Sequence, residues 1–359
     1  MPGDSLRLLL VSTPMGPIGR GLGGGVELTL DSLLRGLGAR GHRQTVLAAS
    51  GSSLAGDLPV SLLMEPGVPQ ASWQHTDRDA PVTIPADALL PRLWQRALAL
   101  QDGYDRVLNL GYDWLPLWLT GVFRTPLFHL VSMGSVSRAM DEAIATVAAS
   151  HPERLAFHTA AQAAEFTLPS PPRLLANGFD FARYTCRATP ERVLGWVGRI
   201  APEKGLEDAA LAAARLGWPL RVWGLREDHA YAEAVEASVP AGTIDWRGFL
   251  PTDRLQVELG ACAALLNTPK WTEAFGNVVV EAMACGVPVV AYRRGGPAEL
   301  VEPGITGVLV PPDDPSALVA ALPEALAIDR RGCRSRAEER FGLGAFAERV
   351  ERWLLAQPG

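Results

Sequence analysis

The 359-residue sequence contains no long apolar segment. A membrane-spanning helix needs about 18 or more consecutive apolar residues, and no window of the chain provides them. Near the N-terminus, the apolar stretch from Leu8 to Val11 is too short for a signal peptide, and Pro14 follows it. The sequence therefore predicts a cytoplasmic protein that does not cross a membrane.

Cysteine is scarce, and an excess of positive charge is absent. The four cysteines are scattered without the paired spacing of a metal site, which predicts reduced, buried thiols. The formal net charge is -6, so neither nucleic acid nor an anionic membrane is expected as the main partner. A composition of 48% apolar and 20% charged residues is typical of a globular protein, and the length predicts two domains.

Short apolar runs alternate with helix-like segments in two successive sets. The first set begins with a predicted buried strand from Leu6 to Ser12, and the pattern restarts with Val193 to Val197. Two such sets predict an α/β protein with two doubly wound domains. We place the domains at residues 1–183 and 184–341, and we expect a C-terminal helix within 342–359 to pack back on the first domain.

A glycine-rich segment separates the first predicted strand from the first predicted helix. Gly19, Gly21 and Gly24 satisfy the GxGxxG pattern of dinucleotide-binding turns, so a nicotinamide dinucleotide site is one interpretation. Two observations weaken this interpretation. Residues 13–18 separate the strand from the glycines, and the second strand ends at Ala48-Ala49-Ser50 without an acidic residue for a ribose.

Two basic residues, Arg199 and Lys204, lie in the loop after the first strand of the second domain. Ligands bind at the carboxyl ends of the strands in such sheets, and Gly198, Pro202 and Gly205 shape the turn. Arginine offers a planar fork to phosphate oxygens and lysine a point charge, so the pair suits a diphosphate. The alternative is a pair of solvated surface charges.

Two carboxylates, Glu273 and Glu281, bracket a turn and a predicted helix over residues 277–284. Glu273 would lie in the loop before this helix and Glu281 two turns along it. The exposed N–H groups of the first helical turn would lie between them and favour an anion. This layout suits a sugar nucleotide, which has hydroxyls at both ends and a charged diphosphate between. The alternative is two unrelated surface carboxylates.

These segments resemble the motifs of family-four retaining glycosyltransferases, which have the GT-B architecture. The matching motifs, in the family's order and spacing, are Gly198-Arg-Ile-Ala-Pro-Glu-Lys-Gly205, Glu273-Ala-Phe-Gly-Asn277 with Glu281, Gly295-Gly-Pro-Ala-Glu299 and Gly304-Ile-Thr-Gly-Val-Leu-Val310. The resemblance covers most of residues 190–325, and the N-terminal half matches more loosely. It implies a GT-B fold, with two Rossmann-like domains that face each other across a cleft.

The resemblance also implies a role for each matching position. Arg199 and Lys204 would hold the diphosphate and stabilise the leaving group, while Glu273 would contact the donor sugar, so these three are the candidate catalytic residues. The other candidate donor contacts are Gly24, Gly25, Arg247, Phe249, Ala274, Phe275, Gly276, Asn277 and Glu281. Of these, Glu281 would accept hydrogen bonds from the ribose. The family needs neither metal nor other cofactor, and no Asp-x-Asp pair lies near these motifs.

The N-terminal half departs from the family pattern at one position. Many members carry a histidine six residues after a proline, at the end of the strand that faces the donor sugar. Here the residue at that distance from Pro126 is Ser132. His129 lies within the predicted strand, where a buried structural residue is the alternative to a site residue. We take Ser132, Met133, Gly134 and His129 as candidate acceptor contacts.

The donor and the acceptor are also inferred from the resemblance. The family implies a UDP-sugar as donor, with GDP- and ADP-sugars as alternatives. The segment from Thr13 to Thr29 is similar to the N-terminus of cyanobacterial pteridine glucosyltransferases. Tyr104, Tyr112, Trp114 and Trp118 would suit stacking on a flat ring, and the alternative is that they are ordinary core residues, which is the more frequent case. The predicted reaction is transfer of a hexose, glucose, from UDP-glucose to a small soluble acceptor, tetrahydrobiopterin.

Three alternative functions stay open. In the first, the acceptor is a lipid or a saccharide. A lipid acceptor would favour a basic amphipathic helix that binds the membrane surface, but the best candidate, Leu90 to Gln101, has only Arg92 and Arg96 as basic residues. A GT-B-fold sugar-nucleotide epimerase would need no acceptor at all. A binding protein that has lost activity would hold the nucleotide without turnover.

Overall fold

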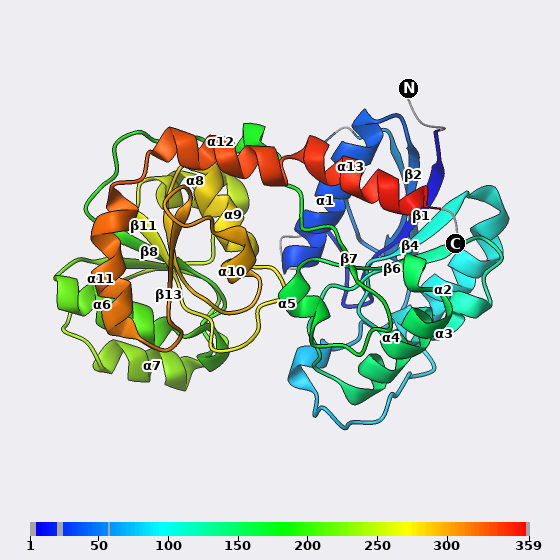
Figure 1. The fold of residues 1–359 in the computed structure, drawn as a ribbon. Coiled ribbons are helices and arrows are strands. Elements are labelled where there is room, and N and C mark those ends of the chain that lie inside the picture. Colours follow the sequence, from blue (N-terminus) through cyan, green and yellow to red (C-terminus); the bar gives the residue numbers. More distant parts are fainter. Residues whose placement is uncertain (1–4, 20–23, 57, 357–359) are drawn as a thin grey trace. The chain divides into compact units, whose positions relative to one another are not determined.

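The computed structural model describes residues 5–19, 24–56 and 58–356. The chain divides into two compact units (Figure 1). Unit 1 comprises Met1–Gly178 and Leu343–Gly359, and unit 2 comprises Phe179–Gly342.

Within the described residues, unit 1 is built on a seven-stranded parallel sheet in the order β3-β2-β1-β4-β5-β6-β7. The strands are β1 (Arg7–Val11), β2 (Arg43–Ala49), β3 (Val60–Glu65), β4 (Arg106–Asn109), β5 (Leu127–Leu130), β6 (Leu155–Phe157) and β7 (Arg173–Leu174). The helices are α1 (Gly24–Ala39), α2 (Leu89–Leu100), α3 (Trp114–Trp118), α4 (Arg138–Ser150), α5 (Ala160–Ala163) and α13 (Leu343–Leu354).

Both faces of this sheet are covered by helices. Successive side chains of a strand point to opposite faces, so Leu8 and Leu10 pack with α1 and α13, whereas Leu9 and Val11 pack with α2. Burial on both faces explains why β1 reads as a continuous apolar run. The edge strand β3 was not predicted. Its side chains are half-buried or exposed, so the expectation of a fully buried strand does not apply to it.

The C-terminal helix α13 packs against α1 and the sheet of unit 1 (Figure 1). Its Trp353 ring stands edge-on to Phe128 of β5, with ring centroids 5.2 Å apart. The Trp353 indole N–H also donates to the carbonyl of Glu153 at 2.8 Å. A Cβ on Gly36 of α1 would lie 2.9 Å from the Ala347 side chain, so glycine is what allows the two helices to approach closely.

The described part of unit 2 has a six-stranded parallel sheet in the order β10-β9-β8-β11-β12-β13. The strands are β8 (Leu194–Val197), β9 (Leu220–Trp223), β10 (Ile244–Gly248), β11 (Ala264–Asn267), β12 (Val289–Tyr292) and β13 (Gly307–Val310). The helices are α6 (Leu206–Leu216), α7 (His229–Ala237), α8 (Thr252–Gly260), α9 (Asn277–Ala284), α10 (Pro297–Leu300), α11 (Pro315–Leu326) and α12 (Arg330–Phe341).

The strand order of unit 2 reverses between β8 and β11. Ligands of open parallel sheets bind at the carboxyl ends of the strands at such a point. Residues 198–205 follow β8 and residues 268–276 follow β11. The topology therefore brings the loops that contain Lys204 and Glu273 to one edge of the sheet. In unit 1 the corresponding reversal lies between β1 and β4.

Two features are absent from the part of the chain that the structure describes, a membrane-spanning helix and a metal-binding cluster. None of the helices combines the length and the apolar character that a bilayer crossing requires. No group of three or more His, Cys, Asp or Glu side chains in this part of the chain is arranged to hold a metal ion.

Candidate functional site

An ion pair joins Lys204 and Glu273, which lie 69 positions apart in the sequence. The Lys204 ammonium donates to Oε2 of Glu273 at 2.6 Å, and the two side chains are 17% and 19% exposed. Lys204 ends a 3-10 turn (Pro202–Lys204) after β8, and Glu273 lies in the loop between β11 and α9. Two segments that the sequence identified separately are thus in direct contact.

Close backbone approach holds these two loops together. Gly205 has a φ of 65°, and a Cβ at this position would lie 2.0 Å from the carbonyl oxygen of Thr268. The Thr268 hydroxyl donates to the Gly205 carbonyl at 2.7 Å, and the Lys270 N–H donates to the Glu203 carbonyl at 2.8 Å. Only glycine fits this left-handed, crowded position, so Gly205 sets the distance from Lys204 to the Glu273 loop.

Arg199 is also paired with carboxylates inside unit 2. Its guanidinium contacts Oε1 of Glu203 at 2.7 Å and Oε2 of Glu227 at 2.5 Å. Both basic residues of the candidate diphosphate site are therefore already neutralised by glutamates. An entering diphosphate would have to share or replace these glutamate partners, as a stronger multidentate acceptor can do.

Glu281 lies on α9 and is only 8% exposed. The Tyr184 hydroxyl donates to its Oε1 at 3.4 Å. Burial raises the pKa of the Glu281 carboxyl to about 7, against the opposing effects of the Tyr184 hydrogen bond and the nearby Arg183. Because hydrogen bonds to the charged form favour it, a ligand that offers hydroxyl groups would stabilise the Glu281 carboxylate.

The Gly295-Gly296 pair shapes the loop that carries Glu273. Gly295 has a φ of 59°, and a Cβ there would lie 2.6 Å from the Glu273 nitrogen. A Cβ on Gly296 would lie 2.2 Å from the Phe275 carbonyl oxygen, and the Gly296 N–H donates to the Glu273 carbonyl at 2.7 Å. This motif therefore acts through the backbone, by letting residues 273–275 lie directly against it.

The remaining predicted donor contacts of unit 2 occupy the same edge of its sheet. Phe275 is buried and packs against Phe179 and Phe341, with centroid distances of 6.4 and 6.1 Å, so only its backbone is available. Arg247, near the end of β10, donates to Glu258 at 2.9 Å, and Phe249 after it is 48% exposed. Around the start of α9 lie Ala274, Gly276 (φ 96°) and Asn277, all half-buried.

The predicted glycines of unit 1 lie at the start of α1. Gly24 and Gly25 are exposed in its first turn, and Gly24 has a φ of 55°. Gly19 has a φ of 84° and lies so close to Ser53 that no Cβ would fit. Gly21 falls outside the described residues. Gly24 and Gly25 belong to unit 1, whereas Arg199 and Lys204 belong to unit 2.

The segment Val131–Ser135, which we call the β5 loop, follows the carboxyl end of β5 and contains three of the candidate acceptor contacts. The Gln162 side chain donates to the carbonyls of Val131 and Met133 at 2.8 and 2.9 Å. The Tyr112 hydroxyl donates to the Gly134 carbonyl at 3.0 Å. Ser132 and Met133 stay half-buried at this edge of the sheet.

Three side chains hold Ser135, at the end of the β5 loop, and one of them is Asp141, which accepts from the Ser135 hydroxyl at 2.8 Å. The Ser135 N–H donates to Oε2 of Glu165 at 3.0 Å. Arg78, from the segment between β3 and α2, donates to the Ser135 carbonyl at 2.5 Å and to its hydroxyl at 2.8 Å. Sequence reasoning missed Gln162, Glu165 and Arg78, because none of them lies in a motif and each acts only through a distant partner.

The candidate acceptor contact at His129 is corrected by the structure. Its ring is 1% exposed within β5, where Nδ1 lies 3.2 Å from Asn109 Nδ2 and Nε2 lies 2.8 Å from the Thr120 hydroxyl. Burial lowers the pKa of His129 to about 3. With both ring nitrogens engaged in the core, His129 is a structural residue and does not offer a surface to an acceptor.

The four aromatic residues expected to stack on an acceptor do not gather at one surface. Tyr104 packs in the cluster around α2, whereas Tyr112 and Trp114 pack in a second cluster around α4. Trp114 and Trp118 stack at 5.9 Å, and Trp118 is 59% exposed. Tyr104 and Tyr112 are therefore core residues, which is the alternative that the sequence left open, and the four residues do not form a single aromatic platform.

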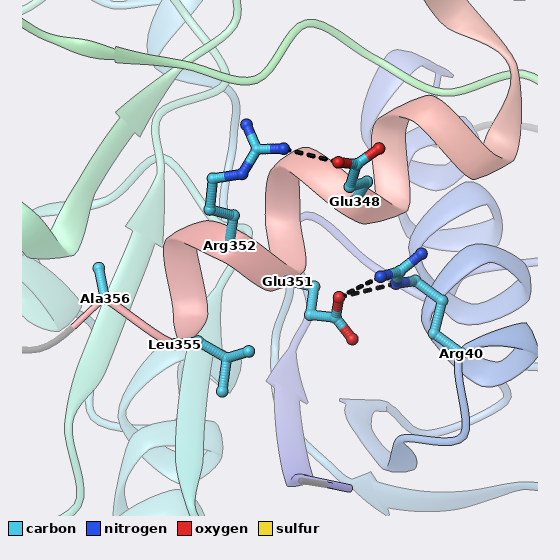
Figure 2. Close-up of a pocket in the computed structure, with 6 residues that line it drawn as sticks. All are labelled: Arg40, Glu348, Glu351, Arg352, Leu355 and Ala356. Atoms are coloured by element: carbon cyan, nitrogen blue, oxygen red, sulfur yellow. Dashed lines mark hydrogen bonds and ion pairs between the residues drawn. The ribbon is translucent and has the colours of Figure 1, made fainter. Parts of the chain in front are cut away.

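A charged pocket lies on unit 1, away from the carboxyl ends of its strands (Figure 2). The residues that line it are Arg40, Glu348, Glu351, Arg352, Leu355 and Ala356. Arg40 follows α1 and precedes β2, so the pocket adjoins the amino edge of the sheet. Arg40 pairs with Glu351, and Arg352 with Glu348 (Figure 2). These pairs neutralise the lining, and we do not assign the pocket to the candidate site.

Comparisons with known proteins match the chain to glycosyltransferases. Residues 185–340 match the family described as glycosyl transferases group 1. The 2-deoxystreptamine N-acetyl-D-glucosaminyltransferase of Streptomyces fradiae is 33% identical over 46% of this chain, and the match spans only 42% of that relative. The D-inositol 3-phosphate glycosyltransferase of Geodermatophilus obscurus is 28% identical over 99% of this chain and 89% of the relative.

Solved structures resemble the whole chain. AviGT4, a glycosyltransferase involved in avilamycin A biosynthesis, superposes with a TM-score of 0.72 at 21% identity and covers 97% of each chain. HepE of Anabaena, solved in complex with UDP and glucose, superposes with a TM-score of 0.75 at 19% identity and covers 98% of this chain and 100% of its own. At such identities the likeness establishes the fold.

Proposed function

We propose that this chain, which has the GT-B fold, is a retaining hexosyltransferase of the glycosyl transferases group 1 family and uses a UDP-sugar. The observation that carries this proposal is the contact between Lys204 and Glu273 at 2.6 Å. This contact supports the proposal because the ammonium would bind the diphosphate and the carboxylate the sugar, at the edge of the sheet where ligands of such folds bind.

Donor binding would exchange partners within this site. The diphosphate oxygens would take the donors of Arg199 and Lys204, which contact Glu203, Glu227 and Glu273 in the structure. The N–H groups at the start of α9 would add a partial positive charge to the same anion. The ribose hydroxyls would donate to Glu281, and the glucose hydroxyls to Glu273.

The reaction would break the bond between the anomeric carbon and the diphosphate. The acceptor hydroxyl would form the new bond on the same face of the sugar and would pass its proton to an oxygen of the departing diphosphate. Negative charge grows on that diphosphate as the bond breaks. Lys204 and Arg199 would stabilise it, and such preorganised charges contribute most where the transition state is more charged than the substrate.

The UDP-sugar is supported by a solved structure and challenged by one relative. HepE of Anabaena binds UDP and glucose with the same fold. A GDP-mannose-dependent alpha-mannosyltransferase of Mycolicibacterium smegmatis is 37% identical over 39% of this chain. A thermal-shift panel of UDP, GDP, ADP and their glucose conjugates tests the base directly. We expect the largest stabilisation with the UDP compounds.

For the acceptor we propose a small soluble molecule, with tetrahydrobiopterin as the first candidate. The similarity of Thr13–Thr29 to pteridine glucosyltransferases supports this candidate. The four aromatic residues add no support, because they do not form one surface for a flat ring. Two relatives are named for other small acceptors, 2-deoxystreptamine and D-inositol 3-phosphate. All three molecules therefore belong in one acceptor panel.

The decisive experiment incubates the protein with UDP-glucose, alone and with each acceptor, and analyses products by mass spectrometry and NMR. An α-glucoside of tetrahydrobiopterin would support the full proposal, because the configuration of UDP-glucose would be retained. Turnover of another acceptor alone would keep the transferase and reject the pteridine. Conversion of UDP-glucose to another sugar nucleotide without acceptor would indicate an epimerase, and UDP binding without turnover an inactive binding protein.

A further inference from the structure

Trp271 contacts both members of the Lys204–Glu273 pair. Its indole N–H donates to Oε2 of Glu273 at 3.2 Å, the same oxygen that receives the Lys204 ammonium. Its ring face lies 4.9 Å from the Lys204 Nζ, within the range of a cation–π contact. Trp271 is half-buried in the loop after β11, so it is not one of the core residues of the sheet.

The three groups share one charge balance. Among the residues that the structure describes, the side-chain donors of Glu273 converge on Oε2, so Oε1 can accept from an incoming sugar. When a diphosphate takes the Lys204 ammonium, Glu273 loses its cationic partner. The indole N–H is then the group that still fixes Oε2, and the ring face still restrains the lysine. A hydrogen bond to a carboxylate is among the stronger ones in proteins.

We propose that Trp271 is a positioning residue of the donor site, which holds Glu273 towards the donor sugar after Lys204 has turned to the diphosphate. This inference rests on the proposed function, since it needs a sugar diphosphate as ligand. It predicts an effect that depends on the sugar. Loss of the indole N–H weakens binding of UDP-glucose and leaves UDP alone almost unaffected.

The first test uses Trp271→Phe, which keeps an aromatic ring and removes the N–H. We expect kcat/KM for UDP-glucose to fall about tenfold, the loss typical of one hydrogen bond to a charged group. The dissociation constant of UDP, measured by calorimetry, stays within about twofold of the wild type. A variant that merely disturbs the fold would weaken UDP and UDP-glucose together.

A matched control is Trp218→Phe. Trp218 also belongs to unit 2, and its ring also makes a cation–π contact, because the guanidinium of Arg192 lies 5.1 Å from the ring centroid. It lies between α6 and β9, at the amino edge of the sheet, so we expect no change in kcat/KM. The double variant Trp271→Phe/Glu273→Gln should be no worse than Glu273→Gln alone, because the N–H acts through that carboxylate.

A second readout follows from the composition of the chain. Lys204 and Lys270 are its only lysines, so protein grown with ¹³C-lysine gives two Cε signals in NMR, and Lys204→Arg assigns them. The ring of Trp271 should shift the Lys204 signal, and Trp271→Leu should remove that shift. Addition of UDP should move the Lys204 signal more than that of Lys270.

The outcomes separate this inference from the proposed function. If the wild-type protein turns over UDP-glucose, Lys204→Ala abolishes turnover and Trp271→Phe matches the wild type, the positioning role is overturned and the transferase stands. Equal losses for UDP and UDP-glucose in Trp271→Phe also overturn it. If the wild type binds no sugar nucleotide and UDP leaves the Lys204 signal unmoved, the proposed function itself fails, and this inference with it.

Discussion

Units 1 and 2 each hold their candidate functional residues at the carboxyl edge of their own parallel sheet. The interactions that hold these residues differ between the two units. In unit 2, side chains of opposite charge pair with one another, as Lys204 does with Glu273 and Arg199 with Glu203. In unit 1, the β5 loop is held mainly through its backbone, by Gln162, Tyr112, Glu165 and Arg78. Side-chain ion pairs can exchange partners with a charged ligand, whereas a backbone fixed from several sides stays as it is.

This difference matters for ligand binding. The donor site of unit 2 should respond to a diphosphate by rearranging side chains. The β5 loop should instead act as a preformed surface, whose effect on an acceptor depends on how firmly it is held. The predictions below separate these two modes, from the largest expected effect to the smallest.

The largest effect is expected from removing the cation of unit 2. Lys204→Ala should reduce kcat/KM for the sugar donor by about 10²-fold or more, because the charge that develops on the leaving diphosphate loses its stabilising group. Steady-state kinetics with varied UDP-glucose measures the loss. Arg215→Ala is the control, since Arg215 lies in the last turn of α6 and donates to Ser316 on the surface. Equal kinetics for Lys204→Ala and the wild type would remove Lys204 from the mechanism.

A smaller effect, and one that depends on pH, is expected from Glu281→Gln. The ribose hydroxyls would donate to the carboxylate, so the variant should bind UDP roughly 10- to 100-fold more weakly at pH 8. The wild-type affinity should fall as the pH drops through about 7, where the carboxyl takes up a proton. The ratio of the UDP affinities of the wild type and the variant should be used, because the titration of UDP itself affects both affinities equally and cancels. A ratio that does not change between pH 6 and pH 8 would contradict the assignment of Glu281.

The same carboxyl group should make the free energy of unfolding of the protein depend on pH. The folded pKa of about 7 lies above the ordinary glutamate pKa of 4.5, so between these values the folded state keeps a proton that the unfolded state has released. Stability must then fall as the pH rises through this window and level off above it. The free energy of unfolding of the wild type relative to Glu281→Gln should decrease by about 3 kcal/mol across this window.

A still smaller effect is expected where unit 1 is held through its backbone. Arg78→Ala removes two hydrogen bonds to Ser135 and an ion pair with Asp141, so the KM for the acceptor should rise roughly 3- to 10-fold while the KM for the donor stays constant. The control is Arg138→Ala, which breaks a similar exposed ion pair with Asp79 but leaves the β5 loop untouched. A change in donor KM alone would show that the β5 loop serves the donor.

The same contrast explains what the sequence revealed. Helix α9 has the predicted bounds, and strands β1 and β8 lie within the predicted ranges Leu6–Ser12 and Val193–Val197, because buried runs and glycine turns are local signals. Lys204 and Glu273 were found because Gly205 and Gly276 mark the turns beside them. Gln162 and Arg78 gave no such signal, since a polar side chain outside a motif looks the same whether it faces solvent or a distant carbonyl. The roles of these residues in catalysis stay predictions until the kinetics are measured.

The smallest effect on catalysis is expected from His129, which the sequence offered as an acceptor contact. His129→Leu should leave kcat and both KM values unchanged, while the buried Asn109 and Thr120 side chains lose a partner and stability falls by roughly 1–3 kcal/mol. Because the pKa of His129 is lowered to about 3 from the ordinary histidine value of 6.5, the unfolded state gains a proton first as the pH falls. His129 therefore lowers stability as the pH falls below about 6.5, opposite to Glu281 of unit 2. Thermal unfolding of His129→Leu from pH 4 to pH 8 should show a weaker loss at acid pH. An unchanged acid limb together with impaired catalysis would return His129 to the acceptor site.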